Sequence, residues 1–452
     1  MFFIYGLAYM QILSLSHKDL LSFHKRTHSI TTFREYKMHK EFLARPFPAL
    51  RPTKESATSV IAPPYDVINL KEAKELAEGK PFSFLRVSRA ELEMPNSTAP
   101  YAPEVYKRAA KNLQLLKQEK ILIQDDKPAY YVYQISNANH TQIGVALSAS
   151  VDAYDKNKIR KHELTRHAKE TDRTNQISTV KAITGPVLLA HREQPALDQL
   201  LLAISSNEAS DYEGMVDGWL HEIWVVKAEN LVGQISSYIN SMPALYIADG
   251  HHRSAAASRV AKRRLEENSD LADDNPCHGF LAVSFSQNAM RILDYNRVIT
   301  DLNGRSAEEF LKLIDRDFIV CKSDRAIKPQ EPKEFGMYLG GSWYLLRLKN
   351  QWAGEDSVSM LDVSVLNDTI LSSILGIEDS RTDQRIDFIG GSRGTEAIEH
   401  VVNSGSMAVG FTLFPTKMSE LMAVADAGLI MPPKSTWFEP KLADGLLSLV
   451  LE

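Results

Sequence analysis

The sequence predicts a mixed α/β protein with two lobes, at residues 38–300 and 301–452. The first reason is length, because 452 residues exceed the size at which a single core keeps growing. The second is that short apolar runs typical of strands alternate with segments whose apolar residues recur at helical spacing. The third is a change of pattern near residue 300, after which a hairpin, a helical region and a late strand follow.

Most of the regular structure is expected in the first lobe. Periodicity and turn signals predict helices at 70–78, 105–120 and 254–265, and strands at 84–88, 129–135, 141–147, 223–226, 244–248 and 279–285. The proline-rich stretch 45–52 is expected to be irregular. In the second lobe we expect a hairpin at 334–348, a helix within 363–375 and a strand at 408–414 that Pro415 ends.

The first 37 residues differ from the rest of the chain. An apolar stretch runs to about Leu15, and a basic stretch follows it. A secretory signal places its positive charge first and ends in a small-residue cleavage site, so this order does not fit one. A transit peptide, or an upstream start with Met38 as the true first residue, explains the segment better, and we exclude it from the predicted fold.

Bulk composition excludes several classes of function. The net charge of −5 gives no global basic field of the kind that nucleic-acid-binding proteins use. The two cysteines, Cys277 and Cys321, match no metal-ligand or redox spacing and are expected to be reduced. No apolar run reaches the roughly 20 residues that a membrane-spanning helix needs. We therefore expect a cytoplasmic protein without a membrane or nucleic-acid partner, and a homodimer stays open.

The most informative local feature is a strand that ends at Asp249-Gly250 and a helix that follows from about Ser254. Unpaired amides and the positive end of the dipole make a helix start favourable for anions. Gly250 allows close approach of the backbone to a ligand. His251, His252 and Arg253 add donors at the same point, and a guanidinium can bind phosphate through two hydrogen bonds. This unit predicts a phosphate site.

Asp249 admits several interpretations. It could hold a Mg²⁺ ion that bridges phosphates, or orient a histidine. In the simplest alternative it caps an ordinary strand-to-helix turn that carries two surface histidines. A zinc site formed by Asp249 and His251 has no third ligand close by in the sequence.

A second polar segment, residues 159–173, crowds basic residues and two histidines around three carboxylates and is not expected in the core. Phosphoryl transfer needs cations to neutralise charge and a base near the acceptor hydroxyl. We take Glu163 as the candidate base with His162 beside it, and Lys169 and Arg173 as candidate phosphate ligands. A solvated charged helix or loop explains the segment equally well. His162-Glu163 with His167 does not form a zinc-protease motif, because histidines five apart diverge on a helix.

Two loops near the C-terminus are further candidates. Residues 431–436 contain two prolines that would rigidify a loop, and Lys434, Ser435 and Thr436 could bind phosphate or substrate. A packed proline turn with an exposed lysine is the alternative. The glycine-rich residues 390–394 could form an anion nest, although a flexible turn is the better interpretation.

With these segments, the chain resembles the uncharacterised bacterial family catalogued as DUF 1015, from about Arg45 to the C-terminus. The resemblance rests on six groups of residues: 45–52, 62–67, 162–165 with 172–173, 248–253, 424–428 and 431–436. The Asp-Gly-His-His-Arg element is also similar to the phosphate-binding loop of the ParB/sulfiredoxin superfamily. That superfamily includes nucleotide-dependent free-serine kinases, sulfiredoxins and DNA-partition proteins.

The resemblance implies a ParB/sulfiredoxin-like nucleotide-binding core, with the C-terminal lobe closing the site. It implies a kinase that uses ATP or ADP with Mg²⁺ and phosphorylates a small hydroxyl substrate, with L-serine the leading candidate. Glu163 would be the base, and residues 249–253 would bind the nucleotide phosphates. One departure from the family pattern is the absence of a proline near Lys169, which weakens the phosphate role of that lysine.

Two other functions follow from the same superfamily. A ParB-like, nucleotide-dependent DNA-binding module would bind DNA with a steep salt dependence, but the net charge of −5 counts against it. A sulfiredoxin-like thiol enzyme would need a reactive cysteine beside the loop. The nearer cysteine in the sequence, Cys277, lies well beyond Arg253.

Overall fold

The computed structural model describes residues 42–452, and the expectation about residues 1–37 lies outside them. Strands and helices alternate through this part, so the predicted mixed α/β class is confirmed. Within residues 42–452, no helix is both long enough and apolar enough to cross a membrane.

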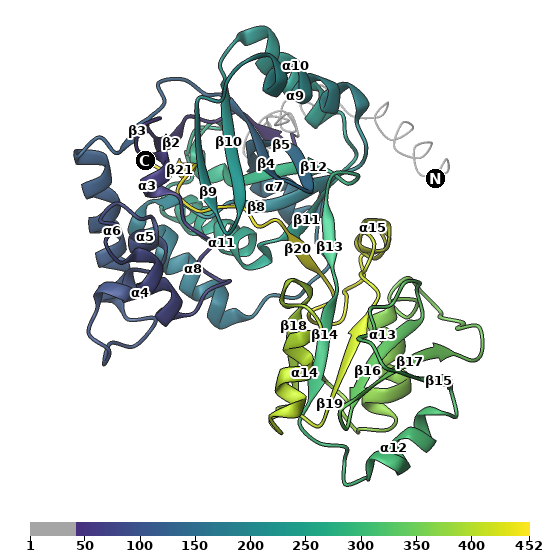
Figure 1. Ribbon diagram of the computed structural model, residues 1–452. Coiled ribbons are helices and arrows are strands. Elements are labelled where there is room, and N and C mark those ends of the chain that lie inside the picture. Colours follow the sequence, from purple (N-terminus) through teal and green to yellow (C-terminus); the bar gives the residue numbers. More distant parts are fainter. Residues whose placement is uncertain (1–41) are drawn as a thin grey trace, which may run out of the picture. The chain divides into compact units, whose positions relative to one another are not determined.

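A nine-stranded sheet dominates the part before residue 290, in the order β6-β11-β8-β12-β5-β4-β10-β9, with β1 paired to β5 (Figure 1). Its strands are β1 (Ala44–Arg45), β4 (Tyr130–Asn137), β5 (His140–Ser150), β6 (Ile159–Arg160), β8 (Val187–His191), β9 (Tyr212–Val216), β10 (Trp219–Val226), β11 (Leu245–Asp249) and β12 (Gly279–Ser286). The centre of the sheet is fully buried, as the unbroken burial of β12 shows. The predicted hairpin of β4 and β5 is confirmed, with Asn137 paired to His140 across the turn.

Helices flank this sheet, and a second group covers a separate apolar cluster around Phe84 and Leu113. The helices are α3 (Ala57–Val60), α4 (Leu70–Ala77), α5 (Leu85–Ser88), α6 (Pro103–Gln118), α7 (Val151–Asp155), α8 (His167–Val180), α9 (Pro195–Asn207), α10 (Glu229–Asn240) and α11 (His251–Glu267). The helices predicted at 70–78 and 105–120 are confirmed as α4 and α6. Asn69 and Glu72 form a capping box at the start of α4, which is why it begins there.

Two local predictions were wrong. Residues 84–88 form the helix α5 and not a strand, because a short buried apolar run fits a helical turn as well as a strand. Residues 45–52 are not wholly irregular, since β1 and β2 (Ala49–Pro52) lie within them. Pro46 and Pro48 fall between these strands and Pro52 at the end of one, where a missing amide costs no ladder hydrogen bond.

A six-stranded sheet is built from residues 295–413, in the order β15-β17-β16-β19-β14-β18 (Figure 1). It contains β14 (Tyr295–Ile299), β15 (Phe318–Ser323), β16 (Glu334–Leu339), β17 (Ser342–Leu348), β18 (Ile386–Gly390) and β19 (Val409–Leu413), with helices α12 (Ala307–Ile314), α13 (Asp362–Leu366), α14 (Glu396–Asn403) and α15 (Met418–Asp426). The predicted hairpin, the helix within 363–375 and the late strand are confirmed.

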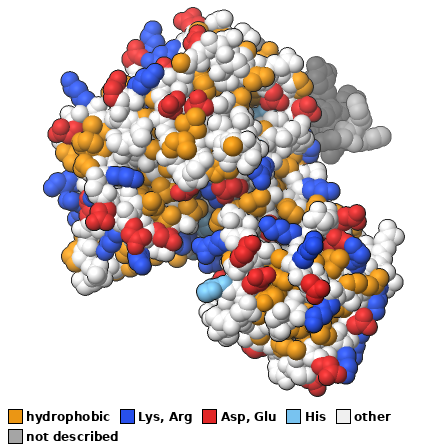
Figure 2. Space-filling model, viewed as in Figure 1, with side chains coloured by type: hydrophobic (Ala, Val, Ile, Leu, Met, Phe, Trp, Pro, Cys, Tyr) orange, Lys and Arg blue, Asp and Glu red, His pale blue; other side chains and the backbone are white. Residues whose placement is uncertain are grey.

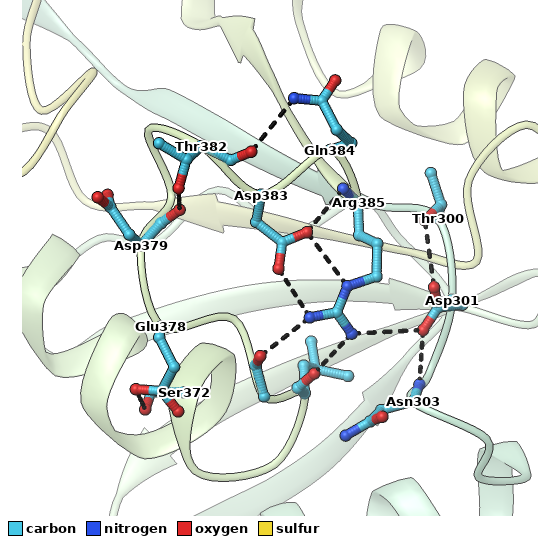
Figure 3. Close-up of polar contacts among 12 residues, drawn as sticks. Thr300, Asp301, Asn303, Ser372, Glu378, Asp379, Thr382, Asp383, Gln384 and Arg385 are labelled. Carbon is cyan, nitrogen blue, oxygen red and sulfur yellow. Dashed lines mark hydrogen bonds and ion pairs between the residues drawn. The ribbon is translucent and has the colours of Figure 1, made fainter.

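Arg385 fixes the turn that leads into β18 (Figure 3). Its guanidinium donates to the carboxylate of Asp383 at 2.8 Å and to the carbonyl of Leu375 at 2.9 Å, and forms an ion pair with Asp301 at 3.8 Å. These contacts join the segment after α13 to the loop after β14. The polar contacts of Arg385 therefore have a structural role, which is to connect the loops of this sheet.

The last residues of the chain return to the strands of the first part. β21 (Ser448–Val450) lies between β2 and β7 (Ala182–Ile183) in a four-stranded sheet with β3 (Leu122–Gln124), and β20 (Trp437–Glu439) pairs with β13 (Arg291–Leu293). Residues 431–450 thereby run past the ends of β6 and β11. The division of the chain at residue 300 stays a prediction.

Candidate functional site

The candidate site lies where two neighbouring strands end. β6 and β11 are parallel, with Ile159 opposite Leu245 and Arg160 opposite Tyr246. The carboxyl ends of parallel strands meet at the same edge of a sheet, so the residues that follow them come together. The topology thus places His162-Glu163 beside the predicted phosphate loop.

The phosphate loop begins α11 at His251, three residues earlier than predicted. Gly250 precedes the helix in the left-handed region, with φ of +98°, and a Cβ there would lie 3.4 Å from the Cα of Val187. The amides of Arg253 and Ser254 both donate to the carbonyl of Gly250, at 2.9 and 3.1 Å. The amides of His251 and His252 are among those that helix geometry leaves without an intrahelical partner, which is the arrangement that favours an anion at a helix start.

His251 touches both candidate residues of the other loop. Its Nδ1 lies 3.7 Å from Oε2 of Glu163, and its Nε2 accepts a hydrogen bond from the amide of His162 at 3.5 Å. The rings of His162 and His251 are perpendicular, with centres 4.5 Å apart. His162 and His251 are buried, whereas the side chain of Glu163 is 46% exposed. Glu163 therefore presents a carboxylate to solvent beside the start of α11.

Burial sets the protonation of these groups. It lowers the pKa of His162 to about 4 and holds the pKa of His251 well below its usual value, so both rings are neutral near pH 7. Desolvation, and then the charge of Asp249, raises the pKa of Glu163. A carboxylate with a raised pKa beside a helix start is the kind of group that accepts a proton during catalysis. The expectation that residues 159–173 lie outside the core was wrong for Ile159, which belongs to the hydrophobic core, and for the buried polar residues His162 and Asp172.

Asp249 forms an ion pair with Lys441, whose Nζ lies 3.0 Å from Oδ2. Burial alone would raise the pKa of Asp249, but Lys441 and Arg253 lower it below its ordinary value. The pKa of Lys441 is raised, since Asp249 outweighs the effect of burial on the ammonium. Lys441 thus supplies positive charge where a Mg²⁺ ion was predicted, and the magnesium role of Asp249 stays a prediction that competes with this pair.

Arg253 is buried and its guanidinium is occupied by protein groups. Nη2 donates to both carboxylate oxygens of Asp66, at 3.0 and 2.8 Å, and Nη1 donates to the carbonyl of Pro186 at 2.6 Å. Its Nε is buried without a hydrogen-bond partner. A phosphate bound by Arg253 would have to exchange with Asp66 or use Nε. His252 accepts from the amide of Arg166 at 3.0 Å, which ties α11 to the loop before α8.

A small cavity with a volume of about 30 Å³ lies beside Arg253 and is also lined by Arg173, Tyr65 and Asp444. The Arg173 guanidinium lies 4.0 Å from the ring centre of Tyr65 and bonds to the carboxylate of Asp172 at 2.7 Å. Burial raises the pKa of Asp444 to about 7, although Arg253 lowers it. Arg173 is therefore a cavity residue, and no recorded contact joins it to Glu163.

The other predicted ligands are spread around these groups. Lys169 is exposed, donates to the hydroxyl of Tyr101 at 3.0 Å and lines a neighbouring cavity with a volume of about 140 Å³. Lys434 is exposed, and its charge lowers the pKa of Glu163, so it belongs beside that carboxylate. The Ser435 hydroxyl donates to the carbonyl of Pro432 at 2.6 Å, which occupies it within its own turn. Thr436 is half-buried.

Sequence reasoning missed three residues of this region. Asp66 and Tyr65 lie within the motif of residues 62–67, so their position in that motif was the available signal. Lys441 carries no local signal, because only the return of the C-terminal segment brings it to Asp249.

Two further candidates lie elsewhere. Cys277 is buried, and burial raises the pKa of its thiol, which opposes the activation that a sulfiredoxin-like enzyme needs. It also interacts with Arg264, far along α11 from the phosphate loop. Residues Gly391–Arg393 form a tight helical turn, and the amide of Gly391 donates to the carbonyl of Asp294 at 2.8 Å. They form the turn that was the better interpretation.

Solved structures similar to the chain were found at low identity. SbnI with a C-terminal truncation, from Staphylococcus aureus, is 13% identical, with a TM-score of 0.36 over 67% of this chain and 87% of that chain. A free serine kinase in complex with AMP is 13% identical, with a TM-score of 0.33 over 68% of this chain and 91% of that chain. A conserved hypothetical protein from Pyrococcus furiosus is 12% identical, with a TM-score of 0.31 over 69% of this chain and 97% of that chain.

No curated protein matches the chain. A family model described as "Protein of unknown function (DUF1015)" matches residues 44–364, which is more than half of the sequence. The matched range includes His162, Glu163 and the whole of the phosphate loop. The chain therefore belongs to the DUF1015 family, as its motifs predict.

Proposed function

We propose that this chain binds a nucleotide through its phosphates at the first turn of α11 and transfers a phosphoryl group to the hydroxyl of a free metabolite. The observation that carries the proposal is the position of Glu163. Its half-exposed carboxylate lies 3.7 Å from the ring of His251, at the start of the helix predicted to bind phosphate. Base and anion site are thus neighbours, as phosphoryl transfer requires.

The phosphate end of the site is supported by unsatisfied amides and by cations. The amides of His251 and His252 point from the positive end of a 17-residue helix, α11. Lys434 acts on Glu163 from the C-terminal segment, and Lys441 is held against Asp249. Both ammonium groups would stabilise the negative charge that builds up on the phosphoryl group during its transfer.

The proposed step exchanges one phosphorus–oxygen bond for another. The acceptor hydroxyl oxygen forms a bond to the terminal phosphorus while its proton passes to the carboxylate of Glu163. The bond from phosphorus to the bridging oxygen breaks, and the leaving nucleotide keeps that electron pair. A raised pKa suits Glu163 to this role, because it makes the carboxylate a stronger base than an ordinary glutamate.

The finer identities rest on the resemblance of the Asp-Gly-His-His-Arg loop. They are L-serine as acceptor and ATP or ADP as donor with Mg²⁺. The cytoplasmic location is proposed from composition, and a homodimer stays open. The DNA-binding alternative gains no support from the surface, where Figure 2 shows acidic and basic side chains interspersed over the visible face, and the net charge is −5.

A nucleotide screen followed by an acceptor panel tests the proposal. Melting of the full chain would be recorded with ATP, ADP, AMP and CTP, each with and without Mg²⁺. A nucleotide at a hundredfold excess over its Kd stabilises the fold by about 2.7 kcal/mol. We expect such a shift for ATP or ADP, and then release of ADP or AMP only when L-serine or a related hydroxyl amino acid is added.

Two results would contradict the proposal. One is the absence of stabilisation by any nucleotide. The other is nucleotide hydrolysis at the same rate with and without each acceptor, since it would leave Glu163 without a hydroxyl substrate. Stabilisation by CTP alone, together with a DNA gel shift that depends on CTP, would favour the ParB-like alternative.

A further inference from the structure

His162, Glu163 and His251 form a group that the proposed phosphoryl transfer uses only in part. One ligand atom from each residue lies within 4.8 Å of the other two, in a cluster found among residues 42–452. The residues come from two loops that parallel strands bring to one edge of the sheet. Local sequence spacing does not reveal this group, because His251 lies 88 residues after Glu163.

His162 offers the lone pair of its Nδ1. In His251 the Nε2 lone pair accepts the 3.5 Å hydrogen bond of the His162 amide, so an ion bound at Nδ1 requires the other tautomer of this ring and the loss of that hydrogen bond. Both rings are buried, and burial favours the neutral imidazole, the form that can bind a metal ion. Nδ1 of His162 is buried and has no hydrogen-bond partner, and the whole residue is only 2% exposed. A buried polar atom of this kind calls for an explanation, and a role as a metal ligand would provide one.

One separation within the group is close to that of two ligands on a coordinated ion. With bonds of about 2.1 Å, two ligands of a tetrahedral zinc ion lie roughly 3.4 Å apart. Oε2 of Glu163 and Nδ1 of His251 are already 3.7 Å apart. The half-exposed Glu163 side chain can rotate to close this gap, whereas the two buried rings, whose ligand atoms lie within 4.8 Å of each other, would have to adjust around the ion.

We propose that His162, Glu163 and His251 bind a divalent transition-metal ion of the Zn²⁺ type. Two imidazole nitrogens and one carboxylate oxygen are a donor set for Zn²⁺, Fe²⁺ or Co²⁺, whereas Mg²⁺ and Ca²⁺ take oxygen ligands. Three protein ligands leave a coordination position for water or substrate. Two zinc candidates from the sequence are thereby revised: His162 and Glu163 join His251 and not His167, and Asp249 is excluded because it is paired with Lys441.

Neighbouring charged residues affect how tightly the three ligands would bind a divalent ion. The positive charges of Lys434 and Arg166 and the negative charge of Asp249 all act on Glu163, and Lys441 is paired with Asp249. The site rests on geometry alone and does not depend on the proposed kinase activity. The two roles of Glu163 compete, however, because a carboxylate oxygen bound to an ion cannot accept a proton.

The test is a titration of the full chain, stripped with a chelator, with Zn²⁺ by calorimetry and with Co²⁺ by visible absorption. No nucleotide or acceptor is present, so the result is independent of turnover. We expect one ion per chain and cobalt bands typical of nitrogen and oxygen ligands. Glu163→Gln, at a half-exposed position that leaves the core intact, should weaken binding at least tenfold, and His251→Asn should abolish it.

His167→Gln and His400→Gln are the matched controls, because both histidines are exposed and lie outside the cluster and outside the predicted phosphate loop. Each should bind Zn²⁺ as the unaltered chain does. The proposal is overturned if the stripped chain binds no Zn²⁺ in a one-to-one ratio. It is also overturned if Glu163→Gln and His251→Asn retain full affinity, or if the control variants lose as much affinity as they do.

Discussion

Lys441 forms an ion pair with Asp249 at 3.0 Å, although 192 residues separate the two in the sequence. The pair links the C-terminal segment to the end of β11, immediately before the predicted phosphate loop. The ammonium group of Lys441 neutralises the carboxylate of Asp249, so no metal ion is needed for that purpose. The pair also makes the loop depend on a part of the chain far beyond it.

Removing this cation should loosen the loop. Lys441→Met leaves Asp249 without its partner, and we expect a loss of roughly 1–2 kcal/mol in the free energy of unfolding. Weaker nucleotide binding should accompany this loss. Chemical denaturation and nucleotide titration measure the two effects. Lys312→Met, which breaks an exposed pair with Glu308 on α12, should stay within about 0.5 kcal/mol of the unaltered chain. Equal losses in both variants would contradict the account.

Gly250 is expected to be necessary for its backbone conformation. At φ of +98°, Gly250→Ala is strained, and we expect a cost of about 1–2 kcal/mol together with weaker nucleotide binding. Gly233 offers a matched control, because it lies exposed within α10 with open space around its Cα. Gly233→Ala should raise stability by about 0.5–1 kcal/mol. Thermal unfolding of both variants checks the opposite signs, and a neutral Gly250→Ala would refute the assigned conformation.

Asp444 should make stability depend on pH. Burial raises its pKa to about 7 in the folded chain, whereas an unfolded aspartate titrates near about 3.9. Between these values folding takes up a proton, so the free energy of unfolding falls as pH rises, by up to roughly 4 kcal/mol. The contribution is complete below the lower value and lost above the upper one.

Asp444→Asn removes this titration. The free energy of unfolding of the variant minus that of the unaltered chain should therefore be larger at pH 8 than at pH 5. Urea denaturation at both pH values measures this difference. Asp324→Asn makes the same substitution at an exposed position. The account fails here if the stability difference between Asp444→Asn and the unaltered chain is the same at both pH values.

The sequence predicted local structure better than contacts between distant segments. The hairpin of β4 and β5 and the helix α4 follow from alternation and capping residues, which act over a few positions. The wrong prediction at residues 84–88 has a physical cause, since burial of a short apolar run does not distinguish a helical turn from a strand. Glu163 and His251 could be named as candidates from their motifs, but their contact depends on the pairing of β6 with β11.

Other parts of the site could not be predicted. Arg253 was expected to bind phosphate, and nothing local shows that Asp66 occupies its guanidinium. Lys441 lies in a segment without regular spacing and reaches Asp249 only because the chain returns to β21. Such contacts join positions far apart in the sequence, and local periodicity carries no information about them.

Acceptor-dependent turnover by Glu163→Gln tests the central claim most directly. Release of ADP or AMP would be measured with the acceptor that the panel identifies, alongside nucleotide binding by the same variant. We predict that nucleotide affinity stays within a factor of about three while turnover falls by about 10² to 10⁴, the usual contribution of a general base. Turnover equal to that of the unaltered chain would contradict the role of Glu163 and, with it, the proposed phosphoryl transfer.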